Sequence, residues 1–381
     1  MALNTVSSDR LSTNVKNTNF TAAEKQDLTN DILPLAGQLG NRNKIINGAM
    51  QISQRNGTSS TNIEGNTTKY HLDRFSIQGN ALDELSAGVA QSTDAPDGFA
   101  HSMKITVNTP ESAIANNEFV TVYQKMEGQD FQDLAYGTSG AKDITMSFYV
   151  KSSITGTFGF TVYRDEPGTD RIVNKTYTIN SANTWERKTI TIAGDTGRAI
   201  QKTNGSVWWN CWHLAAGSDY DSVTSSTWAN YTTTNWAGGA TDTVITTNGA
   251  TWAITGVQLE TGSVVTDFEH RTFGKELALC QRYFVQDFAS SIGTMYESHS
   301  GPNGKFATFN FPVQMRAAPT VNTTNGVDGV VNSQFDNGSG GAVTVSKHAS
   351  KSSVYFYNAG TQFQLTGLTN GSPGASFSAE L

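Results

Sequence analysis

The sequence predicts an all-β protein: a large antiparallel β-sandwich, a smaller β-sandwich after it, and a short helical arm in front. Charged residues make up only 15% of the 381-residue chain, and its 36 glycines occur with abundant Ser, Thr and Asn. This composition is typical of β proteins with many tight turns. Apolar and polar residues also alternate along many short stretches, and no helical stretch between these strands is long enough for the crossovers of a parallel sheet.

The N-terminal arm is predicted over residues 1–44. Residues 1–19 carry isolated apolar side chains without a steady period, so we do not expect them to fold alone. Thr21 to Glu24 has the form of a capping box and opens a helix that runs to about Ile32, where Pro34 stops it. Such an arm either orders on a partner or folds back onto its own domain.

The first β domain is predicted over residues 45–273. Its strands carry apolar residues at every second position, and the clearest are Met103–Val107, Ile144–Val150, Phe158–Val162, Tyr177–Ile179 and Ile190–Ile192. Short turns at Ser153–Gly156 and Glu166–Gly168 favour antiparallel neighbours. Each strand can bury three or four apolar side chains at roughly 1.5–3 kcal/mol apiece, so a domain of this size can have a large core.

Residues 251–260 are expected to be the strand that closes this domain. Their composition is that of a strand buried on both faces. Strict alternation of side chains would place Ala253, Val257 and Leu259 on one face and Trp252 with Ile254 on the other.

The second β domain is predicted over residues 274–381, beginning with a short helix near 275–284. Between Leu277 and Phe284 apolar residues recur at helical spacing. A helix of ~10 residues is marginal alone, so it must dock on another element. Alternation then returns in four stretches, namely Phe309–Val313, Val343–Val345, Val354–Tyr357 and Phe363–Leu365. These strands are sufficient for one small sandwich.

The bulk properties of the chain exclude several classes of partner. A net charge of −7 and a pI near 5.4 argue against nucleic acid, which requires clustered Lys and Arg. No apolar run approaches the ~20 residues of a membrane span, and the N-terminus lacks the apolar core of a signal peptide. Cys211 and Cys280 are interpreted as free buried thiols rather than as a disulfide scaffold.

Familiar catalytic and metal motifs do not occur in the sequence. Its six histidines form neither His-x-His nor His-Glu-x-x-His, and there is no nucleophile elbow or phosphate-binding loop. Acid pairs such as Asp83-Glu84 would serve glycoside hydrolysis only if two carboxyls faced each other across a cleft. We therefore expect no enzymatic activity and no cofactor. Asp165, Glu166 and Asp170 are interpreted as a solvated acidic turn, with Ca²⁺ binding as the alternative.

Aromatic residues concentrate between positions 207 and 236. They are Trp208, Trp209, Trp212, Tyr220, Trp228, Tyr231 and Trp236. Sugars present apolar C–H faces that stack on such rings, so the cluster is a candidate glycan platform, with core packing as the alternative. Trp208 and Trp212 are interpreted as core strand residues. Trp228 and Trp236 lie in a Ser-, Thr- and Asn-rich insert and are the preferred ligand-binding residues of the cluster.

A set of motifs lies between positions 45 and 320. It comprises Asn47–Arg55, Leu72–Phe75, Gln124–Gly128, Thr184–Trp185, Thr255–Gly262, Phe268–Arg271, Cys280–Phe284 and Phe311–Thr320. Together they resemble a family of bacteriophage virion proteins described as tail fibre or tail structural proteins. The resemblance implies a jelly roll like that of carbohydrate-binding modules, a distal β domain and a homotrimeric fibre or spike.

Under this resemblance the protein is a non-enzymatic component of the virion, assembled in the bacterial cytoplasm and located in the phage tail. Residues 1–40 would attach it to a tail or other virion protein, and the C-terminal domain would contact a glycan or protein receptor on the host. A head-attached fibre or decoration protein of the same fold is one alternative. A polysaccharide-degrading tail spike is the other, although the short repeat of a parallel β-helix is not visible.

Host contact is predicted at Phe335, Asp336 and Asn337, in the loops around 325–341 and 370–375. These loops are rich in Gly, Asn and Asp, so they cannot pack a core and offer hydrogen bonds to sugar hydroxyls. Phe335 would supply an apolar face for stacking, or else anchor the loop in the domain.

Overall fold

The computed structural model describes the chain over residues 41–63, 65–287, 299–301, 304–323, 332–336, 342–343, 346–358, 364–365 and 375–381. Side chains are described for 41–63, 65–286, 310–320, 349–354 and 376–381. The helix predicted from Thr21 to Ile32 lies outside these residues.

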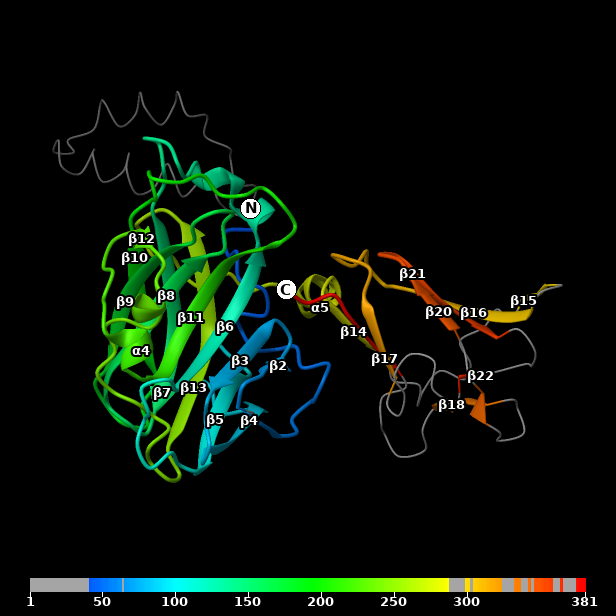
Figure 1. Ribbon diagram of the computed structural model, residues 1–381, viewed down its shortest axis with the longest axis horizontal. Helices are drawn as coiled ribbons and strands as arrows, with labels where there is room; N and C mark the ends of the chain where they lie inside the picture. Colours follow the sequence, from blue (N-terminus) through cyan, green and yellow to red (C-terminus); the bar gives the residue numbers. More distant parts are fainter. Residues whose placement is uncertain are drawn as a thin grey trace, which may run out of the picture.

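Two antiparallel sheets form a sandwich (Figure 1). The six-stranded sheet has the order β1 (Thr61–Asn62), β4 (Ser86–Ser92), β5 (Ser102–Thr109), β13 (Thr251–Thr261), β7 (Ile144–Ser152) and β10 (Glu186–Ile192). The seven-stranded sheet has the order β12 (Ala229–Asn230), β9 (Arg171–Ile179), β8 (Gly156–Arg164), β11 (Ser206–Ala216), β6 (Phe119–Glu127), β3 (Phe75–Asn80) and β2 (Thr68–Leu72). Three short helical segments lie in the connections: η2 (Gly128–Leu134), α4 (Ser218–Asp221) and η3 (Thr233–Asn235).

The strand order identifies the sandwich as a jelly roll. One sheet contains β5-β13-β7-β10 and the other β9-β8-β11-β6, so that the chain passes repeatedly between the two layers. This is the interleaving of two four-stranded halves that defines the fold. The predicted all-β class and antiparallel sandwich are confirmed.

Large aromatic side chains fill the space between the sheets. Trp208, Trp212 and Trp252 are each 0% exposed. Trp208 stacks on Phe131 with ring centroids 4.3 Å apart, and Trp212 packs edge-on against Phe148 at 5.8 Å. The interpretation of Trp208 and Trp212 as core residues is therefore confirmed, and their buried area is a large part of what holds the layers together.

Strand β13 departs from strict alternation at Gly256. Its pairing with β7 shifts register within residues 255–258, and Gly256 has a φ of +61°, as in a β-bulge. A Cβ at Gly256 would lie 2.8 Å from the Phe99 ring, so only glycine fits. The bulge brings four apolar side chains of β13 into one core: Trp252, Ile254, Val257 and Leu259. The prediction that these residues divide between two faces is wrong, because the extra residue reverses the alternation beyond it.

The predicted second β region and its leading helix are confirmed. Helix α5 (Phe273–Gln281) is followed by a sheet of β14 (Phe284–Asp287), β23 (Ala375–Ser378) and β17 (Thr320–Thr323). A second sheet contains β15 (His299–Gly301), β16 (Gly304–Asn310), β21 (Ser353–Asn358) and β20 (Ser346–Ala349). A third contains β19 (Ala342–Val343), β18 (Asn332–Asp336) and β22 (Gln364–Leu365). Figure 1 shows these sheets beside the sandwich, beyond α5.

The residues after β23 return to the sandwich. Glu380 accepts hydrogen bonds from Arg55, at 3.0 Å, and from the buried Arg74. The guanidinium carbon of Arg74 lies 3.5 Å from the centroid of the Tyr283 ring, and the Ala379 amide donates to the Tyr283 carbonyl at 2.7 Å. Charged side chains at this joint are thus paired within the protein.

Residues 41–44, which the sequence assigned to the arm, lie against the sandwich. The Lys44 amide donates to the Leu259 carbonyl at 2.9 Å, and Asn43 Nδ2 donates to the Val257 carbonyl at 3.1 Å. This segment runs alongside β13.

Two predictions about chemistry and environment can be compared with the described residues. Cys211 and Cys280 are both free and buried, as predicted. Among the helices of the described part of the chain, none has the length and apolar character needed to cross a membrane.

Candidate functional site

The outward face of the seven-stranded sheet carries a row of large side chains. Lys125 on β6, Trp209 on β11 and Tyr163 on β8 are direct cross-strand neighbours. Because side chains alternate along β11, Trp208 enters the core while Trp209 points to the opposite face. The Lys125 ammonium lies 3.9 Å from the centroid of the Trp209 ring, and burial lowers the pKa of Lys125.

The connection from β11 to β13 brings further aromatic rings over this face. Tyr220 comes from α4, Tyr231 follows β12, and Trp236 follows η3. A capping box between Thr232 and Asn235 fixes the short turn that precedes Trp236.

Two hydrogen bonds fasten this connection to the sheet. Thr161 Oγ1 donates to the Trp236 carbonyl at 3.1 Å, and Asn174 Nδ2 donates to the Asn235 carbonyl at 2.9 Å. Both donors are buried. The position of the Trp236 ring is therefore set by the sheet beneath it.

These side chains enclose an open hollow of about 210 Å³, which we call the aromatic hollow. It is lined by Gln78, Phe119, Tyr163, Trp209, Tyr220, Tyr231 and Trp236. Trp209 and Tyr163 meet edge-on at 5.1 Å, as do Tyr163 and Tyr231 at 5.2 Å. Trp209, Tyr220 and Tyr231 are half-buried, so parts of their rings face the solvent.

Few polar groups accompany the rings of the hollow. Gln78 Oε1 accepts a hydrogen bond from the Tyr123 hydroxyl at 3.1 Å, and within the described part of the chain the Gln78 amide nitrogen has no acceptor. The Tyr163 hydroxyl donates to Asp170 at 2.6 Å. The hollow therefore combines apolar ring surface with one amide donor and, at its rim, the Lys125 ammonium.

A buried histidine supports the hollow from below. His213 is 1% exposed and lies under Trp236, with ring centroids 5.6 Å apart. Its two ring nitrogens form hydrogen bonds with Thr121 Oγ1 at 2.9 Å and Thr161 Oγ1 at 3.0 Å. Burial lowers the pKa of His213 to about 3, so the ring is neutral at pH 7.

The two tryptophans chosen from the sequence lie in different places. Trp236 lines the aromatic hollow but is only 6% exposed. Trp228 lines a separate cavity of about 320 Å³ between β9 and the segment after β10, which we call the edge cavity. Both keep their place as predicted ligand contacts.

The C-terminal candidates cannot be compared with a site. Phe335 and Asp336 are the last two residues of β18, but their side chains are not among those described, and Asn337 lies outside the described residues. The loops predicted around them also fall largely outside.

Two half-buried rings of the hollow, Trp209 and Tyr231, belong to the aromatic concentration in the sequence but are not among its preferred contacts. A signal for Trp209 was present, since adjacent residues of a strand face opposite sides and Trp208 was already assigned to the core.

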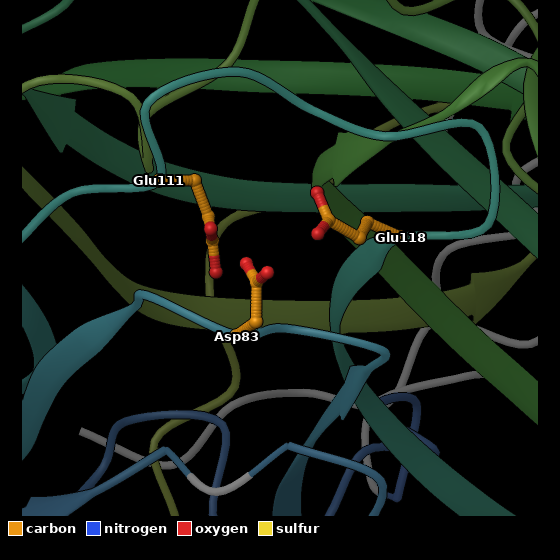
Figure 2. A group of neighbouring side chains, drawn as sticks. All are labelled: Asp83, Glu111 and Glu118. Atoms are coloured by element: carbon orange, nitrogen blue, oxygen red, sulfur yellow. The ribbon is translucent and has the colours of Figure 1, made fainter.

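Three carboxylates converge outside the hollow. Oxygens of Asp83, Glu111 and Glu118 lie within 4.8 Å of one another, and Figure 2 shows the three groups pointing toward a common centre. Glu111 and Glu118 are buried, and burial raises the pKa of Glu111 although the Leu85 amide donates to it at 2.9 Å. Oxygen ligands of this kind suit a hard cation such as Ca²⁺.

The acidic turn at 165–170 differs from its interpretation as a solvated segment. Asp165 is exposed, but Glu166 is only 4% exposed and accepts a hydrogen bond from Arg164 at 2.7 Å. Asp170 accepts from the Glu166 amide at 3.0 Å. A buried carboxylate needs a charged or hydrogen-bonding partner, and here Arg164 supplies it.

Solved structures that are similar to part of this chain include one phage protein and two bacterial proteins. No family model matches, and no curated protein matches. The chain is similar to the enzymatically active domain of tailspike protein 4 of bacteriophage CBA120, with 12% identity, a TM-score of 0.32, and coverage of 58% of this chain and 21% of that one. It therefore spans about a fifth of the length of the phage protein.

Two further similar structures come from bacteria. A putative sugar binding protein from Bacteroides thetaiotaomicron has 11% identity and a TM-score of 0.30, covering 57% of this chain and 99% of that one. A family 11 carbohydrate-binding module of a cellulosomal cellulase of Clostridium thermocellum has 8% identity and a TM-score of 0.26, with the same coverage of 57% and 99%.

Proposed function

We propose that the protein binds a glycan in the aromatic hollow and does so without enzymatic activity, as a component of a phage virion. The observation that carries the proposal is the hollow itself, in which Trp209, Tyr220 and Tyr231 present partly open rings around one concavity. Pyranose rings have apolar C–H faces that pack on aromatic rings. The Gln78 amide nitrogen and the Lys125 ammonium would donate to sugar hydroxyls at the edge of the stack.

The rigidity of the hollow favours binding. Trp209 and Tyr163 stand on central strands, and Trp236 is held by hydrogen bonds to its own carbonyl and to that of Asn235. Few side chains would have to be ordered when a ligand arrives, so less conformational entropy opposes binding.

The virion assignment rests on the motifs between 45 and 320 and their resemblance to phage tail proteins. On this basis the protein is a homotrimeric tail fibre that contacts the host surface, with residues 1–40 docking on a tail or other virion protein. Several copies of a weak glycan site would act together at a cell surface. A head-attached fibre or decoration protein with the same hollow remains the alternative, and immunogold labelling of virions would distinguish the two.

An oligosaccharide microarray followed by calorimetry tests the glycan proposal. Tyr231→Ala removes one partly open ring from the hollow. We expect at least a tenfold loss of affinity for the glycan selected on the array, because the sugar loses the stacking surface of that ring. Tyr149→Ala is the matched control, since Tyr149 is a half-buried tyrosine on β7 of the other sheet.

The proposal fails if the array shows no bound glycan, or if Tyr231→Ala and Tyr149→Ala bind equally well while both remain folded. Incubating the protein with the selected polysaccharide and measuring reducing ends tests the absence of catalysis. Release of reducing ends would favour the tail-spike alternative.

A further inference from the structure

Within the described part of the chain, the edge cavity combines charged side chains with an aromatic ring, Trp228. It lies where β9 and the residues that follow β10 meet Ser226–Trp228, away from the rings of the aromatic hollow. Its volume of about 320 Å³ falls within the ~300–1,000 Å³ of small-molecule sites.

The negative charge at the base of this cavity is fully compensated. Asp195 is 2% exposed and accepts hydrogen bonds on one oxygen from Arg164 at 2.6 Å and Arg171 at 3.1 Å. Its other oxygen accepts from Arg171 and from the Gly197 amide, at 3.1 and 2.9 Å. Four donors occupy the roughly four acceptor sites of a carboxylate, so Asp195 has no capacity left for a ligand donor.

Apart from Asp195, the charged side chains that line the cavity are the cations Lys175 and Arg171. Lys175 donates one hydrogen bond to the Ser226 carbonyl at 2.8 Å, and an ammonium has three N–H groups. Arg171 is partly exposed, with 15% of its side chain accessible. A ligand here would meet N–H donors and a positive charge, in a protein whose net charge is −7.

One wall of the cavity is aromatic. Trp228 is half-buried, and its indole N–H donates to the Ala193 carbonyl at 2.8 Å, which fixes the plane of the ring. Val173 and Ile192 extend the apolar surface. An indole together with a cationic group suits a ligand that has both an apolar ring face and a negatively charged hydrogen-bond acceptor.

We propose that the edge cavity is a second binding site, independent of the aromatic hollow, for a saccharide unit that carries a carboxylate. The pyranose face packs on Trp228, and the carboxylate lies between Lys175 and Arg171. A neutral sugar leaves the Lys175 ammonium without a carboxylate partner among the described residues. A free inorganic anion gains nothing from Trp228.

Titration of the full-length protein with glucuronate, observed by saturation-transfer NMR, tests this site. Glucose is the neutral probe. Inorganic phosphate is the anion without a ring, and because it has no carbon-bound protons its affinity is measured by competition with the glucuronate signal. We expect glucuronate to bind at least fivefold more tightly than either, and its binding to weaken as NaCl is raised from about 50 to about 300 mM, because salt screens the charge.

Two lysine variants locate the binding. Lys175→Gln removes the free ammonium and should weaken glucuronate binding at least fivefold, while Lys202→Gln, the same change at an exposed position outside the cavity, should leave it within twofold. A thermal melt confirms that both are folded. The proposed site is ruled out if glucuronate binds no more tightly than glucose or phosphate. It is also ruled out if the two variants affect glucuronate binding equally. Tyr231→Ala should leave glucuronate binding intact, so failure of the aromatic hollow and failure of the edge cavity can be told apart.

Discussion

At the scale of single residues, burial decides the charge of His213. Its ring is 1% exposed between two threonine hydroxyls, and burial lowers its pKa from 6.5 to about 3. His213 of the unfolded chain therefore binds a proton below about pH 6.5, whereas in the folded chain it stays neutral until the pH approaches about 3. Stability contributed by neutral His213 is complete above pH 6.5 and is lost progressively as the pH falls through that window.

A variant can isolate this contribution. Between pH 7 and pH 4 we expect the wild-type free energy of unfolding to fall by roughly 3 kcal/mol more than that of His213→Gln, which has no group to protonate. Urea unfolding at both pH values measures the difference. Parallel pH dependence of the two proteins would show that His213 does not resist protonation.

Trp236 illustrates why accessibility matters in choosing a site residue. It is 6% exposed, and its ring lies within 6.4 Å, centroid to centroid, of those of Phe119, Tyr163 and His213. Truncating a buried ring of this size typically costs 3–5 kcal/mol through the cavity it leaves. Loss of binding in Trp236→Ala would therefore report on packing, whereas Tyr231 can be removed with less damage.

At the scale of elements, the joint between the sandwich and the C-terminal strands depends on buried charge. Arg74 has 1% of its side chain exposed and pairs with Glu380, which is itself 7% exposed and also pairs with Arg55. Removing one partner of a buried pair leaves the other charge uncompensated in a medium that solvates it poorly.

We expect Glu380→Gln to lower the free energy of unfolding by about 3–5 kcal/mol, because Arg74 stays buried without its counter-charge. Asp97→Asn makes the same chemical change at an exposed carboxylate and should alter stability by less than about 0.5 kcal/mol. Urea titrations of both variants provide the measurement. Equal stability of the two would mean that water or another anionic group compensates Arg74.

At the scale of the whole molecule, the proposed fibre requires association of chains. The arm at 1–40 has no sustained heptads, so a long coiled coil cannot hold the chains together. Association through the β domains and the N-terminal helix predicted from the sequence is the remaining route, and closed rotational symmetry is the rule for such homo-oligomers.

Sedimentation velocity at micromolar concentration measures this state, and we expect a homotrimer. The trimer should persist at high salt, since the predicted contacts are made by packed β domains rather than by surface charges. A stable monomer across this concentration range would count against the fibre assignment.

Local sequence patterns are enough to predict the class of the fold and much of its core. Alternation in Met103–Val107 and Ile144–Val150 is a property of five to seven consecutive residues, and it survives as β5 and β7. The apolar character of Cys211 and Cys280 likewise predicted buried free thiols. Such features are local, because side-chain direction in a strand is fixed by the backbone of its immediate neighbours.

The positions of the candidate binding groups depend instead on contacts between residues that are distant in sequence. Gly256 reversed the alternation of β13 because Phe99 and Tyr149 pack against its backbone, and neither lies near it in sequence. Gln78 and Tyr163 both line the aromatic hollow because β3 and β8 join one sheet. Asp195 likewise accepts a hydrogen bond from Arg164, which lies far from it in sequence. Strand order and register depend on the summed packing of the whole chain, so no window of residues encodes which distant side chains will face each other.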